Sequence, residues 1–392
     1  MTFLEEIRCV PRRGTSCKKW DKQTVMFGED GLTGLWVADM DFKVADCITA
    51  AMHKMVDFGV FGYVYPWDGY YDAIIEWEAK YHHYNVKKDW IRFAPGVVPA
   101  FNWAMLMLTQ PGDSVMVMTP SYYPMLEAPV KNDRKLVTSD LVEVNGRYVV
   151  DYEDFEKKLV DEDCKVFLFC SPHNPVCRVW EREELEKILS ICRKHHVYVV
   201  SDEIHQDIVF GGHEQIPSAL VGDYSDLLIT LIAPSKTFNV AGLQNATLII
   251  EDEKLRALYD KFTAGIRVLY GNTMGYVAAE AAFKEGRPWL EQVLKIIDGN
   301  DKIVREILIP GIPGIDIPEL EGTYLLWLDF HKALKKEEMS DFFEKKCRLA
   351  MDYGNWFNGD PCCVRMNLAT SPEIIRTACE TIVREYKKLR GQ

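Results

Sequence analysis

The sequence lacks several features that would point to particular classes of protein. No hydrophobic run is long enough to span a membrane, and the first eight residues lack the basic-then-apolar pattern of a secretion signal. Basic residues are outnumbered: 46 lysines and arginines against 59 acidic residues give a net charge of −13, which argues against a nucleic-acid partner. The 11 cysteines are odd in number and scattered, as expected for free thiols in a reducing compartment. We therefore expect a cytoplasmic chain with neither a membrane nor a nucleic-acid partner.

The residue spacings of metal sites and of dinucleotide-binding loops are missing as well. Cys362 and Cys363 are adjacent, which suits no tetrahedral site, and Cys192 with His195 and His196 stands at the end of an expected helix, whose dipole favours cations there. We therefore predict no metal site. No G-x-G-x-x-G pattern follows a predicted strand, which argues against a nicotinamide-dependent dehydrogenase.

The length and the order of the predicted elements indicate a two-domain α/β protein. A chain of 392 residues exceeds what one hydrophobic core usually organises. Apolar strands alternate with helical patterns from residue 114 to 250, which is typical of a largely parallel sheet. Three helical segments follow, ending near Pro310, and the remainder reads as a smaller α+β unit with a helix expected over 336–346.

Three of the apolar strands lead into polar residues that can act together. The strand at 164–170 precedes Asn174, the strand at 197–202 ends at Asp202, and the run at 227–232 precedes Lys236. In open α/β sheets the ligand lies beyond the carboxyl ends of the strands. Pyridoxal phosphate needs a lysine for a Schiff base, an acid at its ring nitrogen and a donor to its ring oxygen. Taken alone, Lys236 fits an ordinary solvated surface lysine better than a functional one.

Two further segments have both a functional and an ordinary structural interpretation. The turn at 93–99 opens a helix, and the free N–H groups of a helix start can bind phosphate, although a plain turn explains its prolines equally well. Tyr122 and Tyr123 follow the strand at 114–118, where an aromatic ring can stack on a cofactor or simply fill space under a loop.

Short motifs in a fixed order then identify a family. These motifs are Lys18-Lys19-Trp20-Asp21, Leu35 to Phe42, Phe61-Gly62-Tyr63, Gly96 to Ala100, Pro120 to Pro124, the three strand ends, Glu321 to Tyr324 and Arg365-Met366-Asn367. They span nearly the whole chain and resemble those of fold-type I pyridoxal-phosphate enzymes of the class I/II aminotransferase family. The chain is most similar to the MalY/PatB subgroup of cystathionine β-lyases, which are carbon–sulfur lyases.

The resemblance implies a fold and an assembly. The fold is the aspartate aminotransferase fold, in which a large domain with a mostly parallel central sheet is joined to a smaller α+β domain. Residues 1–45 would form an N-terminal arm that belongs partly to the small domain, 46–288 the large domain, and 289–392 the small one. The protein would be a homodimer with shared active sites.

The resemblance also assigns roles to residues. Lys236, Asp202 and Tyr122 would be catalytic, with Lys236 bonded to the cofactor, Asp202 at the ring nitrogen and Tyr122 stacked on the ring. The further cofactor contacts would be Val97, Val98, Asn174, His205, Ser235 (or Thr237) and, from the second subunit, Tyr63. The substrate contacts would be Arg365 and Ala38.

The activity implied by the resemblance is α,β-elimination. L-Cystathionine, or else L-cysteine or another S-substituted cysteine, would give a thiol, pyruvate and ammonia. An aminotransferase using the same residues is the alternative, and a cofactor-free binding or regulatory protein is a more distant one. His205 and Gln244 stand where many aminotransferases have tyrosine and arginine, which favours the lyase. Cys177 stands where glycine is usual, and predicts an unfavourable backbone angle in that turn.

Overall fold

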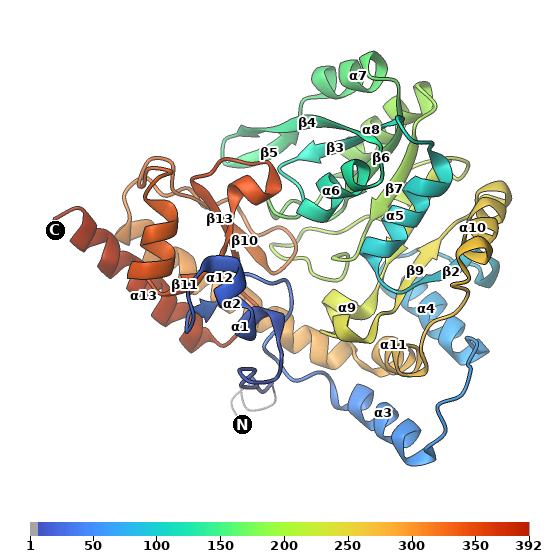
Figure 1. Cartoon of the computed structure of the whole chain (residues 1–392), viewed down its shortest axis with the longest axis horizontal. Coiled ribbons are helices and arrows are strands. Elements are labelled where there is room, and N and C mark those ends of the chain that lie inside the picture. The colour runs from blue at the N-terminus through green and yellow to red at the C-terminus, as the bar shows by residue number, and fades with distance from the viewer. Residues whose placement is uncertain (1–6, 392) are drawn as a thin grey trace.

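The computed structural model describes residues 7–391 (Figure 1). The first six residues, which hold most of the segment inspected for a secretion signal, lie outside the described part, as does residue 392. Across the described residues, no helix combines the length and the apolar character that crossing a membrane requires. The cytoplasmic location stays a prediction.

An eight-stranded sheet forms the centre of the fold, in the order β2-β9-β8-β7-β6-β3-β4-β5. Its middle five strands run parallel, and the outer ones are antiparallel to their neighbours. Every residue of β3 and β8 is buried, which explains why these strands read as continuous apolar runs. The strands are β2 (Ile91–Ala94), β3 (Ser114–Thr119), β4 (Lys135–Val144), β5 (Arg147–Val150), β6 (Cys164–Cys170), β7 (Tyr198–Asp202), β8 (Leu228–Ile232) and β9 (Ala246–Ile249).

Helices cover both faces of this sheet, because successive side chains of a strand point to opposite faces. Val115 and Val117 of β3 share a buried cluster with Phe101 of α5, whereas Met116 shares another with Leu185 of α8. The helices on the two faces are α5 (Val97–Leu108), α6 (Tyr123–Lys131) and α10 (Glu253–Ile266) on one, and α7 (Tyr152–Asp161) and α8 (Arg182–Lys194) on the other.

A third buried cluster joins the helices at the β2 and β9 edge of the sheet. Its large members include Tyr70, Trp77 and Tyr276, whose rings pack edge to face with their neighbours. The helices are α3 (Asp46–Phe58), α4 (Asp68–Tyr81) and α11 (Thr273–Glu285), and α12 (Arg287–Gly311) leads from them to the C-terminal part.

The C-terminal part contains a three-stranded antiparallel sheet in the order β10-β13-β12. The N-terminal arm packs there as expected, because β1 pairs in parallel with β11 and Figure 1 shows the blue N-terminal helices beside the red C-terminal elements. The elements are α1 (Lys18–Asp21), α2 (Gln23–Phe27), β1 (Thr33–Gly34), β10 (Leu325–Asp329), β11 (Leu349–Ala350), β12 (Asp352–Tyr353), β13 (Cys363–Asn367) and α13 (Pro372–Leu389).

The expected fold class is confirmed, and one local expectation is corrected. The helix expected over 336–346 is a π-helix at Asp341–Lys346, preceded by two α-helical residues and a turn. α12 ends at Gly311, near Pro310, where the helical pattern was expected to end. The domain boundaries at 45 and 288 stay a prediction, since one buried cluster contains both Phe169 of β6 and Leu326 of β10.

Candidate active site

The candidate site lies where β6, β7 and β8 end. These three strands are parallel neighbours, so their carboxyl ends meet at one edge of the sheet. Asn174 follows β6, Asp202 ends β7, and Lys236 lies on α9 (Pro234–Thr237), which begins just after β8. All three side chains line one cavity of about 170 Å³.

Most of the residues predicted for the site surround this cavity. Arg365 lies beside it, because its Nη1 donates a hydrogen bond of 2.8 Å to Asn174 Oδ1. Tyr63 does not reach it: its side chain is fully exposed and lines a different cavity of the same chain. The predicted residues that line the cavity are Ala38, Val97, Val98, Tyr122, Asn174, Asp202, His205, Ser235 and Lys236.

Lys236 is placed in a way that favours its neutral form. Its Nζ donates a hydrogen bond of 2.6 Å to the carbonyl oxygen of Ala38. Burial lowers the pKa of Lys236 to about 8, and the charge of Arg365 lowers it further, against the opposing effects of Asp39 and Asp202. An amine with such a pKa is available as a nucleophile or a base near neutral pH.

Asp202 is a buried acid with one free oxygen. Its Oδ1 accepts a hydrogen bond of 3.1 Å from the backbone N–H of Ile204, whereas its Oδ2 has no donor among residues 7–391. Burial raises the pKa of Asp202 to about 7, although the nearby Lys236 lowers it. A cationic N–H group facing Oδ2 would therefore be bound strongly, because it would replace the lost solvation of the carboxylate.

His205 is a neutral buried ring three residues beyond Asp202. Burial lowers the pKa of His205 well below its usual value, and the charges of Lys236 and Arg365 act in the same direction. Its ring lies 6.0 Å from that of Tyr324, and its Nδ1 has no hydrogen-bond partner among the described residues. An unpartnered buried nitrogen of this kind is available to a ligand in the cavity.

The start of α5 forms an anion-binding end of the cavity. The backbone N–H groups of Val97 and Val98 have no acceptor among the described residues, and no side chain caps this helix. Gly96 precedes them at φ 151°, a conformation that other residues rarely adopt. Ser235 adds a hydroxyl that is free of protein partners in the described chain, whereas Gln244 adds no charge. Free N–H groups and the helix dipole together favour a phosphate here.

Taken together, these groups fit pyridoxal phosphate. The anion-binding end suits its phosphate, Asp202 suits its ring nitrogen, and the amine of Lys236, with its lowered pKa, suits its carbonyl carbon. Asn174 uses its oxygen to accept from Arg365, which leaves its amide N–H₂ as a donor for the ring oxygen. No group of three or more His, Cys, Asp and Glu side chains within residues 7–391 could bind a metal ion.

Arg365 is fixed in orientation by three partners. Besides Asn174, its guanidinium contacts the carboxylate of Asp352 in a buried ion pair and the carbonyl oxygen of Trp36 at 3.4 Å. Its Nε has no partner among the described residues. The guanidinium is thus preorganised to receive a further carboxylate.

Two residues near Arg365 were not assigned roles from the sequence. Tyr324 donates a hydrogen bond of 2.9 Å to the carbonyl of Ala38, which also accepts from Lys236. Asn367 donates to the carbonyls of Val37 and Asp39 at 2.6 and 2.7 Å. Both lie in motifs on which the resemblance rests, and they fix the segment that covers the amine of Lys236.

A buried polar network behind Lys236 was also missed. Asp207 Oδ1 accepts hydrogen bonds from Trp77 Nε1 at 3.0 Å and from His82 Nε2 at 2.8 Å. Burial lowers the pKa of His82, but the hydrogen bond to Asp207 and the charges of Asp207, Glu78 and Glu203 together outweigh this effect, and the pKa rises to about 9. The ring is therefore protonated, and the pair is a buried ion pair. The only signal in the sequence was a second aspartate, five residues after Asp202.

The turn after β6 has the unusual backbone angle that Cys177 predicted. Cys177 adopts φ 63°, in the left-handed region that favours glycine. Its buried Sγ donates to the carbonyl oxygen of Leu325 at 2.9 Å, which anchors this turn against β10.

Comparisons with known proteins agree with this geometry. The family described as aminotransferase class I and II matches residues 31–382. Cystathionine beta-lyase PatB of Bacillus subtilis is 38% identical over 92% of this chain and 94% of its own length. The crystal structure of cystalysin from Treponema denticola, with a pyridoxal 5'-phosphate cofactor, has a TM-score of 0.94 at 35% identity, over 97% of this chain and 98% of its own. The PLP-bound C-S lyase of Staphylococcus hominis has a TM-score of 0.91 at 29% identity, over 96% and 97% of the two chains. The chain belongs to the class I and II aminotransferase family.

Proposed function

We propose that this protein is a pyridoxal-phosphate-dependent carbon–sulfur β-lyase. It would convert L-cystathionine and water to L-homocysteine, pyruvate and ammonia, with L-cysteine or other S-substituted cysteines as further substrates. The observation that carries the proposal is the placement of Lys236, with its lowered pKa, in one cavity with Asp202 and Asn174. The similarity to PatB, to the cystalysin structure and to the C-S lyase structure supports it.

The cofactor would be held by the groups described above. Lys236 would bind its carbonyl carbon, Asp202 its ring nitrogen and Asn174 its ring oxygen, while Tyr122 would cover the ring face. Val97, Val98 and Ser235 would hold the phosphate. When bound, pyridoxal phosphate withdraws electrons from the substrate α-carbon and so makes its proton acidic.

The side chains of the protein would then direct the reaction. Arg365 binds the substrate α-carboxylate through a bidentate contact, and Asn174 fixes the orientation of the guanidinium. The neutral amine of Lys236 accepts the α-proton, as its pKa of about 8 allows. Loss of that proton and cleavage of the Cβ–S bond release the sulfur as a thiol. The remaining three-carbon fragment takes up water and leaves as pyruvate and ammonia.

An aminotransferase with the same residues is the second candidate, and family membership alone would allow it. In that reaction the proton taken from the α-carbon would be added to the carbonyl carbon of the cofactor, and the Cβ–S bond would stay intact. His205 and Gln244, both at the cavity, favour the lyase because they differ from the tyrosine and arginine of many aminotransferases. Product analysis after incubation with L-cystathionine tests this choice. Pyruvate and homocysteine support the lyase, whereas an α-keto acid that retains the whole sulfur side chain identifies an aminotransferase.

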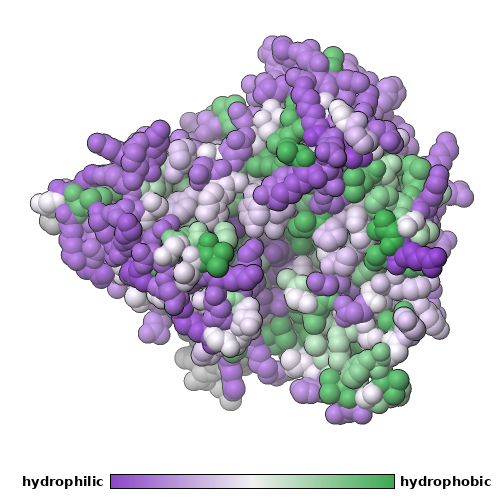
Figure 2. All heavy atoms as spheres, in the orientation of Figure 1, coloured by the Kyte–Doolittle hydropathy of each residue, from purple (hydrophilic) through white to green (hydrophobic). Residues whose placement is uncertain are grey.

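We further propose that the protein is a homodimer with shared active sites. Apolar side chains are exposed along one loop and the end of α3, among them Phe58, Val60, Phe61 and Tyr65. Figure 2 shows hydrophobic residues gathered at the lower edge, where Figure 1 places α3. Exposed apolar surface of this kind marks an interaction site.

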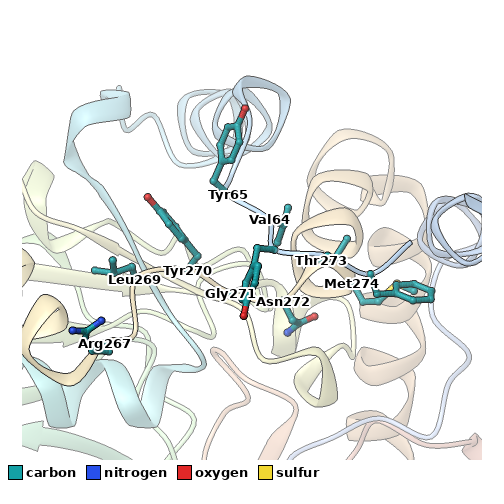
Figure 3. A pocket seen from close by; sticks show the side chains of 12 residues that line it. Val64, Tyr65, Arg267, Leu269, Tyr270, Gly271, Asn272, Thr273 and Met274 are labelled. Atoms are coloured by element: carbon teal, nitrogen blue, oxygen red, sulfur yellow. The ribbon is translucent and has the colours of Figure 1, made fainter. Parts of the chain in front are cut away.

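The shape of this region suits a second copy of the chain. Phe61 to Tyr65 and the segment 267–274 line a cavity of about 860 Å³. Figure 3 shows Tyr65 and Tyr270 beside this hollow, from two segments far apart in sequence. Tyr63 is fully exposed here and reaches no group of its own site. In a two-fold dimer each copy can place its Tyr63 at the partner's phosphate end, as the resemblance implies.

A further inference from the structure

A second cavity lies next to the candidate site and is not used by the proposed chemistry. It has a volume of about 350 Å³. Its walls come from the N-terminal helices, the start of α6 and the segment after β11. The residues that matter for its chemistry are Lys18, Trp36, Tyr123, Glu127, Asp352 and Trp356.

Direct contacts join this cavity to the substrate end of the site. Asp352 forms the buried ion pair with Arg365, and the carbonyl oxygen of Trp36 accepts from the same guanidinium at 3.4 Å. Tyr123 follows Tyr122, and the centres of their two rings lie 5.1 Å apart. A substrate whose α-carboxylate lies on Arg365 therefore has this cavity beside it.

Among the described residues, the cation of Lys18 at this cavity has no ion-pair partner. Glu127 is paired with Lys131 at 2.6 Å, and Asp352 is paired with Arg365. Lys18 forms no ion pair with any of residues 7–391, and its Nζ lies 5.8 Å from the centre of the Trp36 ring. Burial raises the pKa of Asp352, and the charge of Lys18 is close enough to lower it in part. Lys18 is thus an exposed ammonium group that lies near Asp352 but forms no ion pair with any of the described residues.

The walls suit a thioether chain. Trp36 and Trp356 both pack against Phe27, with ring centres 5.2 and 5.9 Å away, so the two indoles form a stable aromatic side of the cavity. Sulfur makes favourable contacts with aromatic rings. The hydroxyl of Tyr123 makes no hydrogen bond to another described residue, which leaves a polar group at the entrance.

We propose that this cavity binds the sulfur substituent of the substrate, and that Lys18 holds a carboxylate at the far end of that substituent. This inference rests on the proposed function and narrows its substrate class. The preferred substrates are thioether amino acids that carry a second carboxylate on the departing thiol, as L-cystathionine does. The first carboxylate binds Arg365, the sulfur chain passes Tyr123, and the second carboxylate pairs with Lys18. Simple S-alkyl cysteines lack the second carboxylate, so Lys18 does not strengthen their binding.

A charge-removing variant of Lys18 tests the inference. We compare kcat/KM for L-cystathionine with kcat/KM for S-ethyl-L-cysteine in wild type and in Lys18→Gln. The ratio of the two kcat/KM values should fall about fivefold, because a partly solvated ion pair contributes roughly 1 kcal/mol. Lys18→Arg should restore most of the ratio. Lys22→Gln is the matched control, since Lys22 is equally exposed, lies four residues away and does not line the cavity.

A binding measurement separates this inference from the proposed function. Lys236→Ala removes the residue needed for turnover, so equilibrium titration of that variant reports binding alone. Adding Lys18→Gln should weaken the binding of L-cystathionine more than that of S-ethyl-L-cysteine. If this difference appears while the wild-type protein makes no pyruvate, the binding site stands and the lyase activity is wrong. If pyruvate forms but neither the ratio nor the binding difference depends on Lys18, the inference is overturned and the lyase activity stands.

Discussion

Thr237 Oγ1 donates a hydrogen bond of 2.7 Å to Asp207 Oδ2, so the residue beside Lys236 is tied to a buried acid. The other oxygen of Asp207 accepts from His82 and Trp77. This arrangement anchors the four-residue α9 through a residue that does not line the cavity. The short helix has no side-chain cap of its own, so the contact with Asp207 fixes the direction in which Lys236 points.

We predict that Thr237→Val lowers both stability and kcat. Losing the donor to a buried carboxylate should cost about 1–3 kcal/mol of unfolding free energy. If Thr237 positions Lys236, kcat should fall severalfold with little change in KM. Denaturant unfolding and steady-state kinetics measure the two effects. Thr263→Val is the control, because Thr263 is a buried helical threonine whose hydroxyl donates to Tyr259 O at 3.0 Å, away from the cavity. A stability loss with an unaltered kcat would limit Thr237 to a structural role.

Attachment of the cofactor to the apoprotein should depend on pH through Lys236. Its pKa in the folded protein is about 8, below its ordinary value of 10.5, so deprotonation occurs at lower pH than for a solvated lysine. Only the neutral amine attacks a carbonyl. The attachment rate should therefore rise about tenfold per pH unit below 8 and level off above it. Stopped-flow absorbance after mixing apoprotein with pyridoxal phosphate measures this. A rate that keeps rising towards pH 10 would show that Lys236 is not desolvated.

Asp202→Asn should keep much of the cofactor but lose activity by about 10²–10³-fold, because an amide cannot supply the charge that stabilises a protonated ring nitrogen. The substitution preserves shape, and the hydrogen bond from Ile204 N can still form. Bound cofactor is measured by alkaline release, and activity by pyruvate production. Turnover within a few-fold of wild type would mean that Asp202 is not the partner of the ring nitrogen.

Two defective variants should complement each other if Tyr63 acts across a dimer interface. Mixing Tyr63→Phe with Lys236→Ala after dissociation gives heterodimers in which one site combines an intact lysine with an intact tyrosine. Random exchange should restore roughly a quarter of wild-type sites. Tyr63→Phe must first be impaired alone, since one hydrogen bond contributes only about 0.5–3 kcal/mol. No recovery despite proven subunit exchange, or a monomer in sedimentation, would contradict shared sites.

The parallel core of the fold could be predicted from the sequence because its strands are buried on both faces. The runs that became β6, β7 and β8 are mostly apolar, and the polar residues at or after their ends had to meet at one edge of the sheet. β4 was missed although it is one of the five parallel strands, because many of its residues are exposed and charges break its pattern. α6 was missed because Pro129 lies inside it.

The residues that line the candidate site could be predicted from the sequence, whereas the contacts that hold them in position could not. Asn174, Asp202 and Lys236 each follow an apolar run, which is a local signal. The bond between Thr237 and Asp207 joins residues 30 apart in sequence and depends on how α9 is oriented. The cavity at Lys18 depends on the arm folding back against β13, and no local pattern in the sequence specifies that contact.

Reductive trapping tests the central claim, that the cavity at the ends of β6, β7 and β8 is a pyridoxal-phosphate site centred on Lys236. The purified protein is loaded with the cofactor, reduced with borohydride, digested and analysed by mass spectrometry, with Lys236→Ala treated in parallel. We predict one reduced cofactor per chain, on the peptide that contains Lys236, and none on that peptide in the variant. Stoichiometric labelling of a different lysine, or equal labelling of wild type and variant, would contradict the account.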